Sequence, residues 1–169
     1  MIPEEPQGIG DISRRRMLRR LGAGVAVAWT APILTSVRVP AYAQVSPGCN
    51  LRASMNGAQE TPPNASPGTG TATFTRTAPN QLSYTYSYQN LIGPGGVNAA
   101  HIHEAPAGTP GGIVIPLSIN AGTTSGSVSD TATADPMLLD RICANPAGFY
   151  INLNTQEFPG GEIRGQLSF

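Results

Sequence analysis

Short apolar runs separated by turn-forming residues fill the chain from about residue 50 to its end. Gly, Pro, Asn and Ser interrupt these runs about every eight to twelve residues, a spacing that is typical of small all-β domains. Strands are predicted at Leu51–Met55, Thr69–Arg76, Leu82–Asn90, Val97–Glu104, Ile113–Ile119, Ser125–Ala132, Phe149–Asn154 and Glu162–Phe169. About eight strands of this length predict an all-β sandwich or barrel.

The clearest alternation of polar and apolar residues is the segment Tyr84-Thr85-Tyr86-Ser87-Tyr88. Side chains at every second position of a strand share one face, so the three Tyr rings are predicted to lie in a row. We interpret this row as a core or cross-strand aromatic ladder. The alternative is an exposed aromatic face that binds a ligand.

One segment has the pattern of a short helix. Asp135 suits the capping position, Pro136 suits the first turn, and Asn145-Pro146 ends the pattern. The apolar stripe would contain Met137, Leu138, Leu139 and Ile142. We expect this helix to cover one end of the sandwich.

The N-terminal residues have the pattern of an export signal. Residues Ser13–Leu18 read Ser-Arg-Arg-Arg-Met-Leu, which is a twin-arginine pattern, and the small-x-small site Ala41-Tyr42-Ala43 follows a mildly apolar run. That run is shorter than the roughly 20 residues of a membrane-spanning helix, so no membrane span is expected after cleavage. The predicted organisation is a signal peptide at residues 1–43, a linker at 44–49 and one domain at 50–169. We expect the twin-arginine pathway to deliver the folded domain to the periplasm or the medium.

Removal of the signal peptide changes the charge balance. Residues 44–169 contain four Arg, seven acidic side chains and no Lys, which makes the remaining chain mildly acidic. Nucleic acids and anionic lipids need clustered positive charge to bind, so neither is expected as a partner. The remaining length fits a single domain with one core.

The chain contains two cysteines, Cys49 and Cys143. Disulfides persist in exported proteins, so we favour a bond between them, with two free buried thiols as the alternative. Closing so long a loop would stabilise the fold by roughly 4 to 5 kcal/mol.

Sequence motifs of common enzymes are missing from the chain. It has neither a Gly-x-Ser-x-Gly nucleophile motif nor a phosphate-binding Gly-x-x-x-x-Gly-Lys loop. Glu162 and Arg164 would share a strand face, which favours a structural ion pair, with each other or with a neighbouring strand, over an acid–base pair. We therefore predict no catalytic residue and no enzymatic activity.

The only two histidines form the triplet His101-Ile102-His103 on a predicted strand. Both rings should point away from the core while Ile102 points into it, and two such imidazoles can share one copper or zinc ion. Metal sites normally take three or four protein ligands, and the chain has no third His. A bound metal would therefore be held more weakly or would recruit Glu104, Glu157 or Asp130. The alternative, which we favour, is that the two rings bond to backbone and hold the segment 105–112 against the sandwich.

Four stretches together resemble the CHRD domain, a family named for repeats in chordin: Gly57–Pro63, Ala100–Glu104, Phe149–Thr155 and Phe158–Leu167. They stand in the family's order, and the resemblance covers nearly all of residues 50–169. It implies an immunoglobulin-like Greek-key β-sandwich that is distantly similar to copper/zinc superoxide dismutase, and it implies no established activity. Many CHRD domains carry a His at the position of Asn154, so a metal site that used it would lack one ligand here.

Two hypotheses of function follow. The preferred one is an exported, non-enzymatic binding or structural module of the cell envelope or extracellular space, without a cofactor, whose partner is a protein or a glycan. The alternative is a superoxide-dismutase-like protein that binds copper or zinc through His101 and His103.

Overall fold

The computed structural model describes residues 49–169. The predicted signal peptide, residues 1–43, lies outside the described residues, as does the predicted linker except for Cys49.

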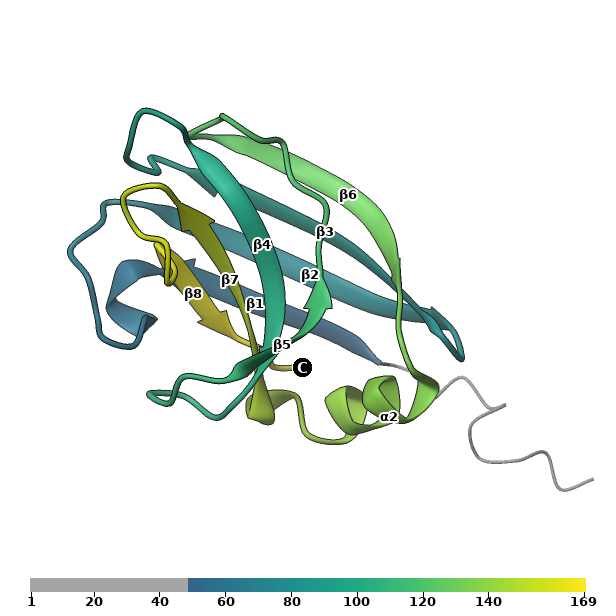
Figure 1. Ribbon diagram of the computed structural model, residues 1–169. Coiled ribbons are helices and arrows are strands. Elements are labelled where there is room, and N and C mark those ends of the chain that lie inside the picture. The colour runs from purple at the N-terminus through teal and green to yellow at the C-terminus, as the bar shows by residue number, and fades with distance from the viewer. Residues whose placement is uncertain (1–48) are drawn as a thin grey trace, which may run out of the picture. The chain divides into compact units, whose positions relative to one another are not determined.

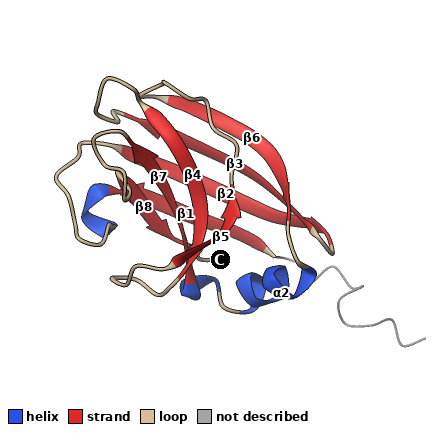
Figure 2. Cartoon of the chain, in the orientation of Figure 1, coloured by secondary structure: helices blue, strands red, loops and turns tan. Residues whose placement is uncertain are grey.

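Within the described residues, eight antiparallel strands form one sheet in the order β5-β4-β7-β8-β1-β2-β3-β6 (Figure 1). The strands are β1 (Asn50–Asn56), β2 (Thr69–Ala78), β3 (Gln81–Gln89), β4 (Val97–Glu104), β5 (Gly112–Pro116), β6 (Gly126–Thr133), β7 (Phe149–Thr155) and β8 (Ile163–Gln166). The helical segments are η2 (Gly57–Gln59), α2 (Pro136–Ala144) and η3 (Pro146–Gly148), so strands dominate this part of the chain (Figure 2). The predicted all-β fold with one short α-helix is confirmed.

The sheet curls around a single core into a nearly closed barrel (Figure 1). Ile102 of β4 and Ile151 of β7, from one half of the sheet, belong to the same buried cluster as Phe74 of β2 and Tyr86 of β3, from the other half. Each strand contributes alternate side chains to this core, as the alternating sequence pattern predicts.

The segment after β5 links the two halves of the sheet. A strand was predicted over Ile113–Ile119, but β5 ends earlier because the next residues cross the gap between the sheet edges. The backbone N–H of Leu117 donates to the carbonyl of Ala100 at 2.9 Å, and that of Ser118 donates to the hydroxyl of Tyr84 at 2.8 Å. Residues 117–125 thus bridge β4 and β3.

The predicted tyrosine row is confirmed as a core ladder, and the exposed-face alternative is wrong. Tyr84, Tyr86 and Tyr88 are 4, 0 and 3 % exposed, and successive ring centres lie 6.2 and 6.0 Å apart. Their hydroxyl groups reach the bridging segment, where Tyr86 donates to the carbonyl of Ser118 and Tyr88 bonds to the hydroxyl of Thr123, each at 2.5 Å. Burying these rings therefore also positions residues 117–125.

The last predicted strand, Glu162–Phe169, is shorter in the structure because the chain changes partners near its end. The backbone N–H of Leu167 donates to the carbonyl of Phe149 at 2.9 Å, next to the β7–β8 ladder. Ser168 instead forms an isolated bridge with Arg52 of β1. The C-terminus is thereby held between the two neighbouring strands.

Helix α2 begins and packs as predicted, with one exception. The carboxylate of Asp135 accepts hydrogen bonds from the backbone N–H groups of Met137 and Leu138, and Leu139 and Ile142 are fully buried. Met137 is 72 % exposed, because two residues of helix separate it by about 200° from the stripe at Leu139. No helix among residues 49–169 is long and apolar enough to cross a bilayer.

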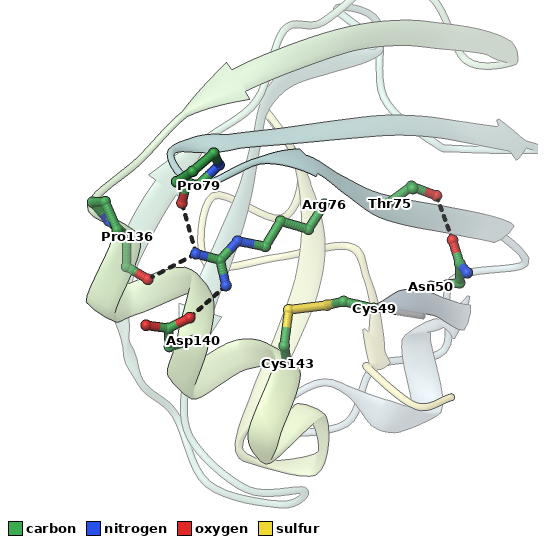
Figure 3. The surroundings of a disulfide bond; sticks show 8 residues. All are labelled: Cys49, Asn50, Thr75, Arg76, Pro79, Pro136, Asp140 and Cys143. Atoms are coloured by element: carbon green, nitrogen blue, oxygen red, sulfur yellow. Dashed lines mark hydrogen bonds and ion pairs between the residues drawn. A yellow bond between two sulfur atoms is a disulfide. The ribbon is translucent and has the colours of Figure 1, made fainter. Parts of the chain in front are cut away.

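A disulfide and an ion pair attach α2 to the sheet (Figure 3). Cys49 and Cys143 are bonded, with their Cα atoms 5.5 Å apart, so the predicted disulfide is confirmed and the free-thiol alternative is wrong. The buried guanidinium of Arg76 contacts Asp140 at 2.5 Å and donates to the carbonyl of Pro79 at 2.7 Å. These contacts fix the helix across one end of the barrel.

Candidate functional site

Polar side chains gather on the face of β4, β7 and β8 that points away from the core. The antiparallel register pairs His101 with Asn152, His103 with Tyr150, and Asn152 with Arg164, so these five side chains share that face. With Asn154, Gln166 and the loop residue Glu60 they form a group that we call the polar layer. The loops at residues 57–68 and 105–111 cover much of the layer, so that most of its side chains are buried, whereas His101, Asn154 and Gln166 are half-buried.

The predicted orientation of the histidine triplet is confirmed. Ile102 is fully buried in the core, and both imidazoles lie on the opposite face. The two ring centres are 5.6 Å apart, with the ring planes nearly perpendicular. His103 is only 9 % exposed because the 105–111 loop covers it, whereas His101 is half-buried.

His103 holds the covering loop, as the favoured hypothesis predicts. Its Nδ1 lies 2.9 Å from the carbonyl oxygen of Gly111, and its ring stacks on Tyr150 with centres 4.8 Å apart. A carbonyl oxygen can only accept, so Nδ1 carries the proton and, in the neutral ring, Nε2 carries a lone pair. The hydroxyl of Tyr150 accepts from the backbone N–H of Gly111 at 3.1 Å, which fastens the same residue a second time.

His101 does not follow that prediction. Its buried Nδ1 has no hydrogen-bond partner within the described residues, so this ring does not hold the loop. Burial is the main cause that lowers the pKa of His101 below its ordinary value, and the neighbouring His103 lowers it further. A contact with Asn154 has the opposite, smaller effect on this pKa. The ring is therefore neutral, and available as a lone-pair donor, around neutral pH.

Arg164 connects the polar layer to both covering loops. Its side chain is 1 % exposed, and its guanidinium carbon lies 3.4 Å from the centre of the Tyr150 ring. One guanidinium nitrogen donates to the hydroxyl of Thr61 at 3.2 Å and to the carbonyl of Thr109 at 2.9 Å. The other donates to the carbonyl of Pro106 at 2.9 Å. One side chain therefore fixes the geometry of both loops.

Glu162 and Arg164 do not pair with each other, so that alternative of the prediction is wrong. Strand β8 begins at Ile163, so the strand alternation that would place both side chains on one face does not reach Glu162. The Glu162 carboxylate instead accepts from the hydroxyl of Ser66 at 2.6 Å and from the backbone N–H of Ile92 at 2.7 Å. Glu162 therefore anchors loops as well.

Glu60 is a buried carboxyl beside Arg164. Burial raises its pKa to about 7, against the lowering effects of the Arg164 charge and of a hydrogen bond from the Thr61 backbone. It packs against Gly161, where φ is 135° and a Cβ would come within 2.4 Å of Oε1, so this position requires Gly. A pocket of about 340 Å³ opens here between the loops, lined by Glu60, Thr61, Gly108 and Arg164.

No third His, Cys, Asp or Glu joins the predicted metal ligands His101 and His103 in the part of the chain that the structure describes. Glu104 pairs with Arg141 at 2.7 Å, and Asp130 accepts from the hydroxyl of Ser118. These suggested carboxylates are thus engaged elsewhere.

Sequence reasoning missed most of the β7 and β8 side chains of the polar layer: Tyr150, Asn152 and Gln166. The sequence does indicate a polar strand face here, because Phe149–Thr155 has Tyr, Asn and Asn at alternate positions. The alternation predicts a polar face but does not predict that loops cover it, so the burial of Asn152 at 1 % exposure is a finding of the structure.

Comparison with known proteins gives one family match. The model of the CHRD domain matches residues 51–167. No curated protein matches, and no solved structure matches.

Proposed function

Because this chain belongs to the CHRD domain family, we propose that it is an exported, non-enzymatic module that binds a partner or builds structure outside the cytoplasm. The disulfide supports this location, since such bonds persist in oxidising compartments. The twin-arginine pattern at Ser13–Leu18 and the cleavage pattern Ala41-Tyr42-Ala43 support the route.

The main support for a binding function is that Arg164 bonds to the two covering loops. Its donors hold two loops in fixed positions instead of facing a substrate, so the polar layer acts as a support for a surface. Loops held by a rigid scaffold are common binding elements. We assign the binding surface to the 57–68 and 105–111 loops and the pocket between them, with a protein or a glycan as the partner.

Export can be tested with the arginine pair. Replacing Arg14 and Arg15 by Lys removes the twin-arginine pattern while keeping the charge. The protein should then accumulate uncut in the cytoplasm, whereas an Arg20→Lys variant should be exported and cleaved after Ala43. Cell fractionation and N-terminal sequencing measure both outcomes. Export of the double variant would contradict the proposed route.

Binding can be tested with charges at the pocket rim. Ala58 and Ala107 are exposed and line the pocket, so Glu at either position should weaken binding at least tenfold without loss of stability. Ala121→Glu adds the same charge in the exposed bridging segment and is the control. The measurement is adsorption of mature protein to purified envelope glycans and to envelope proteins. Equal adsorption of all variants would place the surface elsewhere.

A further inference from the structure

Four buried polar atoms of β4 and β7 have no hydrogen-bond partner within residues 49–169. They are Nδ1 of His101, Nε2 of His103, and the Oδ1 atoms of Asn152 and Asn154. Buried polar atoms are almost always paired, so four on one face of two adjacent strands require an explanation. Two of these side chains, His103 and Asn152, are more than nine-tenths buried.

Rotating the Asn amides or the His103 ring does not supply the missing hydrogen-bond partners. The Nδ2 atom of Asn152 donates to the carbonyl of Gly160 at 3.3 Å, and that of Asn154 donates to the carbonyl of Pro159 at 2.7 Å. Rotating either amide by 180° would set an oxygen against a carbonyl oxygen. His103 is fixed in the same way by the carbonyl of Gly111. Nε2 of His103 and the two amide oxygens are therefore acceptors, and Nδ1 of His101 is a fourth when its Nε2 carries the proton, so the cluster suits a cation.

The imidazoles also have the separation of two metal ligands. A metal that binds each nitrogen at about 2.0–2.1 Å leaves the two ring centres roughly 4.5–6 Å apart, and the observed separation of the His101 and His103 ring centres is 5.6 Å. The bond from Nδ1 of His103 to the Gly111 carbonyl is the kind of contact that orients a ligating imidazole and leaves Nε2 free. Asn154 contacts His101, and its Oδ1 is one of the four atoms without a partner.

We propose that His101, His103 and the amide oxygen of Asn154 form a site for one divalent late transition-metal ion, with Cu²⁺ preferred over Zn²⁺. Imidazole nitrogen with oxygen is a donor set that Cu²⁺ accepts in tetragonal geometry, and Cu²⁺ binds such ligands more tightly than Zn²⁺ does. With three protein ligands the ion keeps open positions for water. This site does not depend on the proposed binding surface, since none of its ligands lines the pocket between the loops.

The test is titration of metal-free mature protein with Cu²⁺ and with Zn²⁺, followed by calorimetry and, for Cu²⁺, electron paramagnetic resonance. We expect one equivalent of Cu²⁺ with nitrogen hyperfine structure, and weaker binding of Zn²⁺. His101→Gln is the main variant, because Nδ1 of His101 makes no hydrogen bond within the described residues and the fold should tolerate its loss. It should weaken Cu²⁺ binding at least tenfold and reduce the nitrogen hyperfine signal.

A second variant tests the site by an expected gain in Cu²⁺ affinity. Asn154→Asp should tighten Cu²⁺ binding at least fivefold by adding charge at the site, whereas Asn50→Asp, at an exposed position of β1, should not. The proposal would be overturned if wild type and His101→Gln bound Cu²⁺ equally, or if neither bound it stoichiometrically. Ordered water would then be the partner of the four atoms. Export and binding by the loops would be unaffected by that result.

Discussion

Arg164 is the residue on which both covering loops depend. Burying a guanidinium is favourable only when its donors are satisfied, and here loop carbonyls at Thr109 and Pro106 satisfy them. Lys offers a single ammonium group in place of the planar fork and cannot stack on Tyr150 in the same way. The position therefore requires the geometry of Arg as well as its charge.

Arg164→Lys should lower the free energy of unfolding by about 3 kcal/mol, because several buried hydrogen bonds and the cation–π contact are lost together. Urea denaturation measures the change, and hydrogen exchange should show loss of protection in the 57–68 and 105–111 loops. Arg52→Lys, at an exposed position, is the matched control and should change stability by less than about 0.5 kcal/mol. Equal stability of both variants would show that Arg164 does not hold the loops.

The carboxyl of Glu60 should make stability depend on pH. Its pKa is raised from 4.5 to about 7 in the folded protein, so the folded state binds its proton more tightly than the unfolded state does. The contribution to stability is complete below about pH 4.5 and is lost as pH rises through about 7, for a total on the order of 3 kcal/mol. Arg164 is the charged group that faces it.

Glu60→Gln should remove that part of the pH dependence and should be more stable than wild type at pH 8. Thermal unfolding of both proteins between pH 4 and pH 8 measures the difference. A wild-type stability that rises from pH 5 to pH 8 relative to the variant would contradict the assigned direction.

At the scale of elements, sequence patterns predicted those strands and helix ends that depend on residues close together in the chain. The Tyr84–Tyr88 alternation predicted a core strand, and Asp135 predicted the start of α2, because strand periodicity and helix capping depend on neighbouring residues. The end of β5 and the burial of His103 depend on distant parts of the chain: Ser118 bonds to Tyr84 of β3, and the His103 ring stacks on Tyr150 of β7. No local pattern contains that information.

The bridge made by residues 117–125 should depend on the tyrosine hydroxyls. Tyr86→Phe keeps the ring packing but leaves the carbonyl of Ser118 without its 2.5 Å bond, which should cost about 1 kcal/mol. Hydrogen exchange should show faster opening of residues 117–125, while β7 and β8 keep their protection. Thr85→Ala, on the exposed face of the same strand, is the control. Uniform loss of protection across the domain would show that this hydroxyl supports the whole fold instead.

At the scale of the whole molecule, the disulfide and the proposed route of export constrain each other. The bond joins residues 94 positions apart and so encloses most of the domain. The twin-arginine pathway carries folded proteins, and the cytoplasm keeps thiols reduced. The proposed route therefore requires the domain to fold before Cys49 and Cys143 are joined.

A variant with both Cys49 and Cys143 replaced by Ser should remain folded and cooperative at 25 °C. Its free energy of unfolding should nevertheless be about 3 to 5 kcal/mol lower, because the open chain gains entropy when it unfolds. The ion pair of Arg76 with Asp140 and the buried Leu139 and Ile142 should hold α2 in place without the bond. Denaturant titration and near-ultraviolet circular dichroism measure stability and packing. An unfolded double variant would mean that the cross-link is needed for folding, and export in the folded state from a reducing compartment would then be ruled out.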